Sequence, residues 1–287
     1  MKKIDAILLS TLLSTLLCAT LSAKEEEHHN HEETNNIKIN YETLDFTNSK
    51  KKEDGIRYGV ELDHEDKQHH IQFYYENTQT DTTKIVPKDL EVDKYTLKYQ
   101  YKLAPKERIT LLYSTVDDNL MKETNGGNIY GLGYSQNGIG LTQYLSDYPH
   151  FDVYQSDLKY SFKKSGVKTT FIGKYIHLKD KNSNNFSKKA KSDYFTTGVK
   201  LHSHYNGFHL GAGMYIGKRI FGIMKDGFRV QHHAMEFKET YMLGVGHSLG
   251  KNMATHLRYV YQKAKEIPLN NDNVKVQNIS LDLVYKF

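Results

Sequence analysis

Hydrophobic and polar residues alternate with a period of two along most of the chain after residue 36. Between Asp93 and Leu103, three Tyr and two Leu residues occupy every second position, and Thr, Lys and Gln fill the positions between them. Successive side chains of a β-strand point to opposite faces, so this pattern predicts a strand with one apolar and one polar face. Helical spacing fits these stretches less well.

We predict about fourteen strands of this kind, with twelve as the alternative count. The predicted strands cover residues 37–47, 55–64, 69–79, 93–103, 107–116, 127–136, 139–147, 151–163, 166–178, 193–205, 207–217, 237–249, 252–264 and 276–287.

The connections between these strands alternate between short and long. Six are short, near residues 65–68, 105–106, 137–138, 164–165, 206 and 250–251. The others are longer, near residues 49–54, 81–92, 117–126, 146–150, 179–192, 218–236 and 265–275. Outer-membrane barrels combine short periplasmic turns with longer external loops, so the alternation predicts that fold with both termini in the periplasm. A soluble sandwich has no reason to keep this order.

The lipid environment requires the predicted sheet to close on itself. In lipid, every backbone N–H and C=O must be paired within the protein, and only a helix or a closed sheet achieves this. The strands are too polar to be helical spans, so we predict an all-β fold, a transmembrane, antiparallel, up-and-down β-barrel. All four prolines (Pro87, Pro105, Pro149 and Pro268) fall in connections, because proline cannot donate to a strand ladder.

The N-terminal region predicts export. Lys2 and Lys3 precede an apolar stretch that ends in Leu21-Ser22-Ala23, which is the pattern of a cleaved signal peptide over residues 1–23. Residues 24–36 are rich in His and Glu and contain no apolar residue, so we expect a disordered periplasmic tail before a barrel over residues 37–287. Cys18 is the only cysteine, which excludes disulfides and thiol chemistry from the mature chain.

The last segment alternates apolar and polar residues and ends with Leu283, Tyr285 and Phe287 on one face. It resembles the C-terminal signal of outer-membrane β-barrels, which the barrel-assembly machinery reads. The whole mature chain also resembles small monomeric fourteen-stranded porins, in pattern only. The resemblance implies an outer membrane of Gram-negative type and a passive or gated pore for small hydrophilic solutes or ions. It transfers no functional residues.

The polar faces of the strands supply the predicted lumen. Both signs of charge occur there, as in pores that set a weak ion preference, or as structural ion pairs that fill a non-conducting barrel. A barrel of about fourteen strands is wider than its own side chains can fill, so water, a loop or the tail must occupy it. The predicted lumen-lining residues are Lys38, Glu42, Arg57, Glu61, Asp63, Glu76, Lys98, Lys102, Asp157, Lys159, Lys200, Arg258 and Asp282.

The connection at residues 218–236 is unusually apolar for an external loop. It contains Ile220, Phe221, Ile223 and Met224, which avoid water. We predict that it folds into the mouth of the barrel as a constriction loop. The alternative is that it contacts a partner or lipid.

Histidines gather toward the predicted periplasmic side. Neutral imidazole binds zinc, copper and nickel, which makes the barrel a candidate for weak divalent-metal binding, with no other cofactor expected. The alternative is a solvated, pH-responsive rim. The candidate ligands are His28, His29, His31, His69 and His70.

The remaining partners follow from location and charge. We expect contacts with outer-membrane lipid and with lipopolysaccharide, whose phosphates the lysines of residues 179–192 would attract. The net charge of +5 is scattered over an exported chain and does not indicate nucleic acid.

The sequence contains no HExxH and no glycine-rich phosphate loop. Residues 246–250 read GHSLG and match GxSxG, but they lie at the end of a predicted strand and not in the strand-to-helix turn of a nucleophile elbow. His247 and Ser248 are adjacent in a predicted strand, so they point to opposite faces and cannot pair. We therefore expect no enzyme. A lipid-modifying enzyme and an adhesion barrel that acts through its loops are alternatives.

Overall fold

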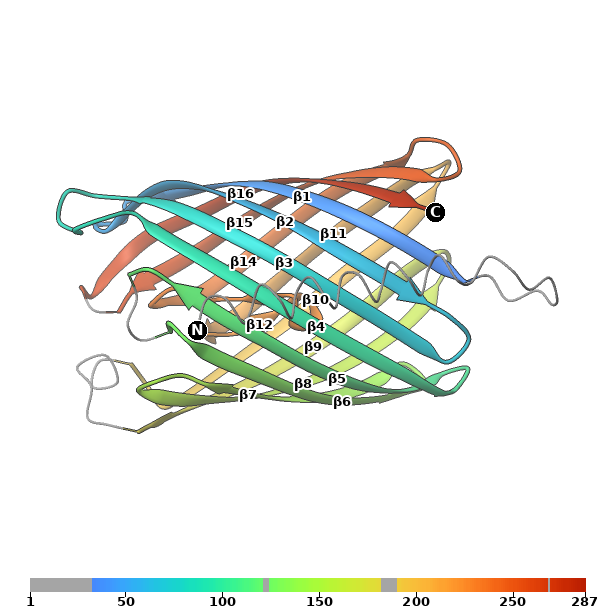
Figure 1. Ribbon diagram of the computed structural model, residues 1–287, viewed down its shortest axis with the longest axis horizontal. Coiled ribbons are helices and arrows are strands. Elements are labelled where there is room, and N and C mark those ends of the chain that lie inside the picture. The colour runs from blue at the N-terminus through green and yellow to red at the C-terminus, as the bar shows by residue number, and fades with distance from the viewer. Residues whose placement is uncertain (1–32, 121–123, 182–189, 268) are drawn as a thin grey trace, which may run out of the picture. The chain divides into compact units, whose positions relative to one another are not determined.

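A computed structural model describes residues 33–120, 124–181, 190–267 and 269–287. Within these residues, fourteen antiparallel strands form one closed barrel (Figure 1). The barrel strands are β1 (Thr34–Thr47), β2 (Lys52–Glu65), β3 (His69–Thr82), β4 (Leu90–Ala104), β5 (Glu107–Asp118), β6 (Gly127–Gln136), β7 (Ile139–Asp147), β8 (Phe151–Lys164), β9 (Val167–Asp180), β10 (Asp193–Tyr205), β11 (Phe208–Arg219), β14 (Met235–Ser248), β15 (Met253–Glu266) and β16 (Asn271–Lys286).

Each barrel strand pairs with the next one along the chain, and β1 pairs with β16 to close the sheet. The predicted up-and-down, antiparallel barrel is therefore confirmed, with fourteen strands and not twelve in the described residues. None of the described residues forms a helix long and apolar enough to cross a membrane.

Several strands extend beyond their predicted bounds. β1 begins at Thr34, so the last residues of the predicted tail belong to the barrel. The reason is that Asn36 has a partner on each side, Asp63 in β2 and Lys286 in β16. A backbone flanked by two strands satisfies its hydrogen-bonding groups by continuing the ladder. The signal peptide and residues 24–32 of the tail lie outside the described residues.

The outer wall of the barrel is apolar. Large side chains such as Leu132, Leu158 and Leu243 are 57–63% exposed, and the residues between them point inward. A continuous apolar wall of this kind requires hydrocarbon around it. Leu283, Tyr285 and Phe287 belong to this outer wall, where Leu283 lies beside Ile39 across the β1–β16 seam. Their role as an assembly signal stays a prediction.

The two ends of the barrel differ. One end carries the start of β1, the end of β16 and the short turns, and we call it the terminal end (Figure 1). Its turn at residues 206–207 is typical, with Asn206 at φ 46° and Gly207 at φ 77°. Two successive positive φ values define the tight hairpin turn that fits twisted strands. The longer connections lie at the other end, which we call the loop end.

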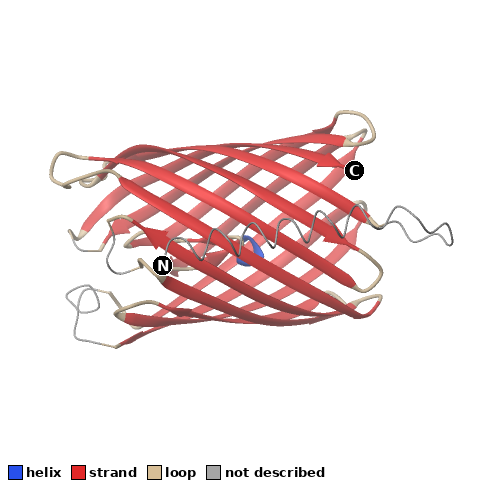
Figure 2. Ribbon diagram, viewed as in Figure 1, coloured by secondary structure: helices blue, strands red, loops and turns tan. Residues whose placement is uncertain are grey.

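The connection between β11 and β14 folds back into the barrel. We call residues 220–234 the lumen loop. It forms a small hairpin from β12 (Ile223–Met224) and β13 (Arg229–Val230), joined by the 3-10 turn η1 (Lys225–Gly227). Figure 2 shows this turn inside the barrel wall.

The barrel interior is apolar toward the loop end, which departs from the expected polar lumen. Leu44, Phe46, Val274 and Val276 point inward from β1 and β16 and are at most 4% exposed. They are buried because Met235 and Phe237, at the start of β14, pack against them.

Candidate functional site

The lumen loop lies across the interior and packs apolar side chains on the contiguous strands β4–β10 of the wall. Ile220 and Phe221 pack on β8, β9 and β10 in a cluster that includes Phe151, Ile176 and Tyr194. Further along the loop, residues of β12 and β13 pack on β4–β7. In that second cluster, Ile223 and Val230 contact the group formed by Leu90, Val92, Leu112, Val116, Ile129 and Tyr144. The predicted constriction residues Ile220, Phe221, Ile223 and Met224 are all buried, at most 9% exposed.

Hydrogen bonds from the wall hold the backbone of the loop. The side chain of Gln155 on β8 accepts a hydrogen bond from the Ile223 N–H and donates one to the Ile223 carbonyl, both at 2.8 Å. The Lys174 ammonium on β9 donates to the same carbonyl at 3.0 Å and forms an ion pair with Asp157. Polar groups of β12 that would otherwise be orphaned inside the barrel are thereby satisfied.

A cluster of charged residues fixes the far side of the loop. The Arg229 guanidinium donates to both carboxylate oxygens of Glu42, at 3.1 and 2.7 Å, and lies 3.6 Å from Glu76. Arg57 bridges the same two carboxylates at 3.0 and 3.3 Å, and Lys94 pairs with Glu76. We call these five residues the latch.

The side chains of the latch are largely buried from solvent. The side chains of Glu42 and Glu76 are 2% and 1% exposed, and that of Arg229 is 13% exposed. A bidentate arginine–carboxylate pair is among the strongest polar contacts in a protein. In such a site, removal of one partner is far more costly than the net contribution of the pair, because the other charge stays buried.

The turn of the loop makes a second set of contacts. Asp226 pairs with Lys159 of β8. The Phe228 ring packs edge-on against Tyr74, with ring centroids 6.0 Å apart, and the Lys98 ammonium lies 4.9 Å from the centre of the Phe228 ring. The Asp226 side chain is exposed, and the cations Lys159 and Lys200 hold the pKa of its carboxyl below the usual range.

Gly227 allows the turn to approach the wall. Its φ is +107°, and a Cβ atom would lie 1.9 Å from Leu112 Cδ1. We expect Gly227→Ala to destabilise the seated loop by about 1–3 kcal/mol, the usual cost of overpacking. Backbone amides of residues 223–230 should then exchange hydrogen about tenfold to a hundredfold faster.

Gly126 is the matched control for this substitution. Its φ is also positive, at +74°, but no atom would lie within 4 Å of its Cβ. Gly126→Ala therefore tests backbone strain without the clash, and it should leave exchange in the lumen loop unchanged. Equal exchange in both variants would mean that the contact with Leu112 does not seat the loop.

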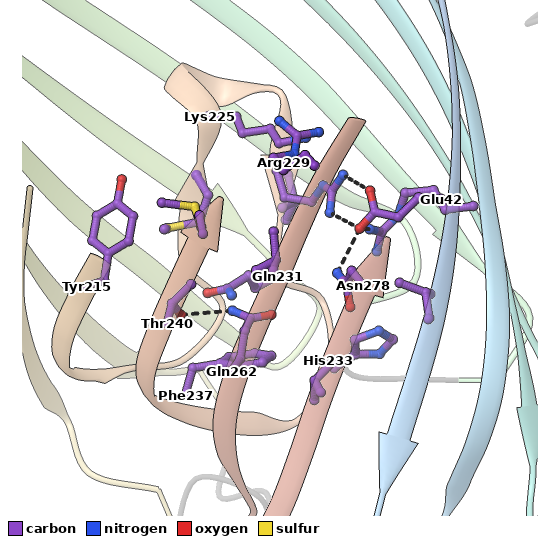
Figure 3. A pocket seen from close by; sticks show the side chains of 18 of the residues that line it. Glu42, Tyr215, Lys225, Arg229, Gln231, His233, Phe237, Thr240, Gln262 and Asn278 are labelled. Carbon is purple, nitrogen blue, oxygen red and sulfur yellow. Dashed lines mark hydrogen bonds and ion pairs between the residues drawn. The ribbon is translucent and has the colours of Figure 1, made fainter. Parts of the chain in front are cut away.

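A cavity of about 90 Å³ lies between the lumen loop and strands β14–β16 (Figure 3). Five basic side chains line it, and Glu42 is its one acidic lining residue in the described chain. The basic residues are Arg57, Lys200, Lys225, Arg229 and Arg258. Apolar side chains, among them Phe46, Phe237 and Val276, form the rest of the wall.

Lys225 and Lys200 differ from the other cations of this cavity. Within the described residues, neither has a carboxylate within 4 Å. Burial, and then repulsion from Arg229 and Arg258, lowers the pKa of Lys225 well below its usual range. A second cavity of about 160 Å³ lies on the terminal side of the loop, with Lys225 between the two.

His232 and His233 close the loop against the wall near β2 and β4. Burial lowers the pKa of both imidazoles well below the usual range, and the cations Lys52, Lys94 and Arg57 lower it further. The Lys52 ammonium donates to His233 Nδ1 at 2.8 Å, which requires that nitrogen to be unprotonated. Both imidazoles are therefore neutral at pH 7.

The structure distributes the other predicted lumen residues into local pairs. Of the predicted set, Glu42, Arg57 and Glu76 meet in the latch. Lys159 of β8 pairs with Asp226 of the lumen loop, and Asp157 pairs with Lys174, which donates to the loop. Toward the terminal end, the pairs are Lys38 with Glu61, Asp63 with His70 at 2.8 Å, Lys102 with Glu65 at 2.7 Å, and Arg258 with Asp282 at 3.8 Å.

The predicted metal ligands do not come together in the described residues. His69 contacts the Tyr99 hydroxyl at 2.7 Å, whereas His70 contacts Asp63 and Gln100 from the opposite face of β3. His28, His29 and His31 lie outside the described residues, as do Lys188 and Lys189 of the basic external loop.

Two members of the latch were missed at the level of sequence. Lys94 has the same parity as Lys98 on β4, so the alternation could have identified it. Arg229 lies in a connection without periodicity, and no local signal marks it.

Comparison with known proteins shows the fold. No protein-family model and no curated protein matches the chain. Among solved structures, a Pseudomonas aeruginosa FadL homologue has a TM-score of 0.52 at 9% identity, over 88% of this chain and 90% of that one. The Ralstonia pickettii toluene transporter TbuX has a TM-score of 0.50 at 9% identity, over 89% of both chains.

A further similar structure is the Acinetobacter baumannii outer membrane protein Omp33, with a TM-score of 0.49 at 11% identity, over 88% of this chain and 99% of that one. At such identities the likeness concerns the fold alone. Together with the apolar outer wall and the closed fourteen-stranded sheet, it shows that this chain is an outer-membrane β-barrel.

Proposed function

We propose that the protein is a gated outer-membrane channel and that the lumen loop is its gate. The observation that carries the proposal is that the loop spans the interior and is anchored on opposite walls, at Gln155 and at Glu42. The cavities beside it measure about 90 and 160 Å³. Binding sites for small molecules usually measure about 300–1,000 Å³, so a solute larger than a few waters requires the loop to move.

The strand pairings at both ends of the lumen loop are irregular, which supports movement of the loop. The register between β11 and β14 shifts between Ile216 and Arg219, and that between β14 and β15 shifts between Phe237 and Glu239. Bulges of this kind interrupt the ladder and change the direction of a strand. They flank the loop on both sides, so the hairpin can move while the rest of the wall keeps its pairing.

The lining of the cavity supports small organic anions as the solutes. Of the five basic side chains that line the cavity, Lys200 and Lys225 have no carboxylate within 4 Å in the described residues, and apolar side chains form much of the remaining wall. An anion beside Lys225 would stabilise an ammonium that burial and neighbouring cations disfavour. The expected solute therefore combines a carboxylate or a similar group with an apolar portion. The proposed solutes, small organic anions, are a narrower class than the small hydrophilic solutes or ions expected from the sequence.

A reversible tether tests the gate. We would place cysteines at Lys159 and Asp226, which form an ion pair between β8 and the turn of the loop. Residues 24–287 contain no natural cysteine, so the background is clean. A reducible bis-thiosulfonate reagent that links the two should abolish single-channel openings in planar bilayers, and a reductant should restore them.

The single substitution Lys159→Cys, treated with the same reagent, is the control for modification without a tether. If the tethered protein conducts as well as the untethered one, the lumen loop is not the gate.

A further inference from the structure

Three histidines face the lumen together at the terminal end of the barrel. His202 and His204 lie two residues apart on β10 and therefore share one face of the strand. The tight turn at residues 206–207 places His209 of β11 directly opposite His204. Among the described residues, these three form the one group of His, Cys, Asp or Glu with ligand spacing, and their candidate ligand atoms all lie within 4.8 Å of one another.

The three rings are in contact. His202 Nε2 lies 2.8 Å from His204 Nε2, and the centroids of the His204 and His209 rings are 4.3 Å apart. The Ser248 hydroxyl lies 3.3 Å from His209 Nε2, where it can orient the ring. His202 and His204 are exposed, so an ion in the lumen can reach them.

A fourth histidine lies beside this group because of a glycine. Gly246 of β14 pairs with His209 on one side and with His256 of β15 on the other. A Cβ on Gly246 would lie 2.1 Å from His256 Cδ2, so the absence of a side chain lets the His256 ring lie across β14. Its centroid is 5.3 Å from that of His209.

We infer that His202, His204 and His209 form a binding site for a divalent transition-metal ion such as Zn²⁺, Cu²⁺ or Ni²⁺, with His256 next to it. The donor set carries the inference, since imidazole nitrogens suit these ions, and three protein ligands with an accessible fourth position leave room for exchange. The inference does not depend on the lumen loop or on conduction.

Location determines what the ion would do. In an outer-membrane barrel the terminal end faces the periplasm. An ion bound there would place two positive charges at the inner mouth, and it would respond to metal on the periplasmic side. The site differs from the tail histidines and from the pair at residues 69–70 that the sequence suggested.

Calorimetric titration of the detergent-solubilised mature protein with ZnCl₂, and with CuCl₂ and NiCl₂ in parallel, tests the site. We expect one ion per chain. His202→Asn/His204→Asn/His209→Asn should weaken binding by more than about a hundredfold, beyond the loss usual for outer-shell changes. Copper bound to the unsubstituted protein should show nitrogen couplings in its electron paramagnetic resonance spectrum, and these should disappear in the triple variant.

Three controls locate the ligands. His69→Asn/His70→Asn and deletion of residues 24–32 should both keep full affinity. Gly246→Val displaces the His256 ring, whose Cδ2 would lie 2.1 Å from the new Cβ, and should weaken binding only modestly. Heat-modifiable migration on gels confirms that each variant is folded. Unchanged affinity in the folded triple variant would overturn the site, as would an equal loss in the His69/His70 variant.

Discussion

Replacement of residues 221–233 with a short Gly-Ser linker should convert rare openings into a permanently conducting barrel. The loop is the segment that the structure places across the interior, and its removal joins the cavities on its two sides. The barrel should tolerate the change, because β11 and β14 are already antiparallel neighbours. A linker of about four residues then suffices, as in ordinary hairpins.

Planar-bilayer recording of single channels measures the effect. Loss of Phe221, Ile223 and Val230 from the interior costs about 1.5–3 kcal/mol each in burial, but all fourteen wall strands keep their pairing. A matched control shortens the external connection at residues 83–89 instead, which leaves the lumen loop seated. A folded but silent loop-replacement variant would mean that another part of the protein closes the lumen.

Arg229→Ala should have the second-largest effect, with a shift of the loop toward its released state. The substitution removes the cation that the loop contributes to the latch and leaves Glu42 and Glu76 buried. Loss of a buried ionic partner costs about 3 kcal/mol. That corresponds to roughly a hundredfold change in the ratio of released to seated loop. Open probability in bilayers measures it.

Two further variants separate geometry from charge. Arg229→Lys keeps the charge but cannot donate to both oxygens of Glu42 in the same fork, so we expect an intermediate open probability. Lys251→Ala removes an exposed cation from a turn at the terminal end and should change nothing. If Arg229→Ala and Lys251→Ala behave alike, the latch does not hold the gate.

The wall of the barrel could be predicted from sequence because its cause is local. Apolar and polar residues such as Leu97 and Lys98 alternate because every strand has one face toward lipid and the other toward the interior. The interior was harder, because what faces inward depends on what fills the lumen. Leu44 and Phe46 have the same parity as Glu42, yet they are buried against Met235 and Phe237 from a distant strand.

The histidine site could be predicted from the sequence only in part. The sequence predicts a short connection between β10 and β11 with residue 206 alone in it. The turn is the two-residue Asn206-Gly207, which fixes the register that sets His204 opposite His209. The proximity of His256 was not visible, because it depends on two further strand pairings and on the missing side chain of Gly246.

Glu42 stands where the first and last strands of the barrel meet. It lies on β1, accepts a hydrogen bond from Asn278 of β16 at 2.7 Å, and receives Arg229 from the lumen loop. The receptor for Arg229 is therefore complete only after β1 and β16 have joined. We therefore expect the lumen loop to dock after the barrel has closed, because the carboxylate that binds Arg229 is held from both sides of the β1–β16 seam.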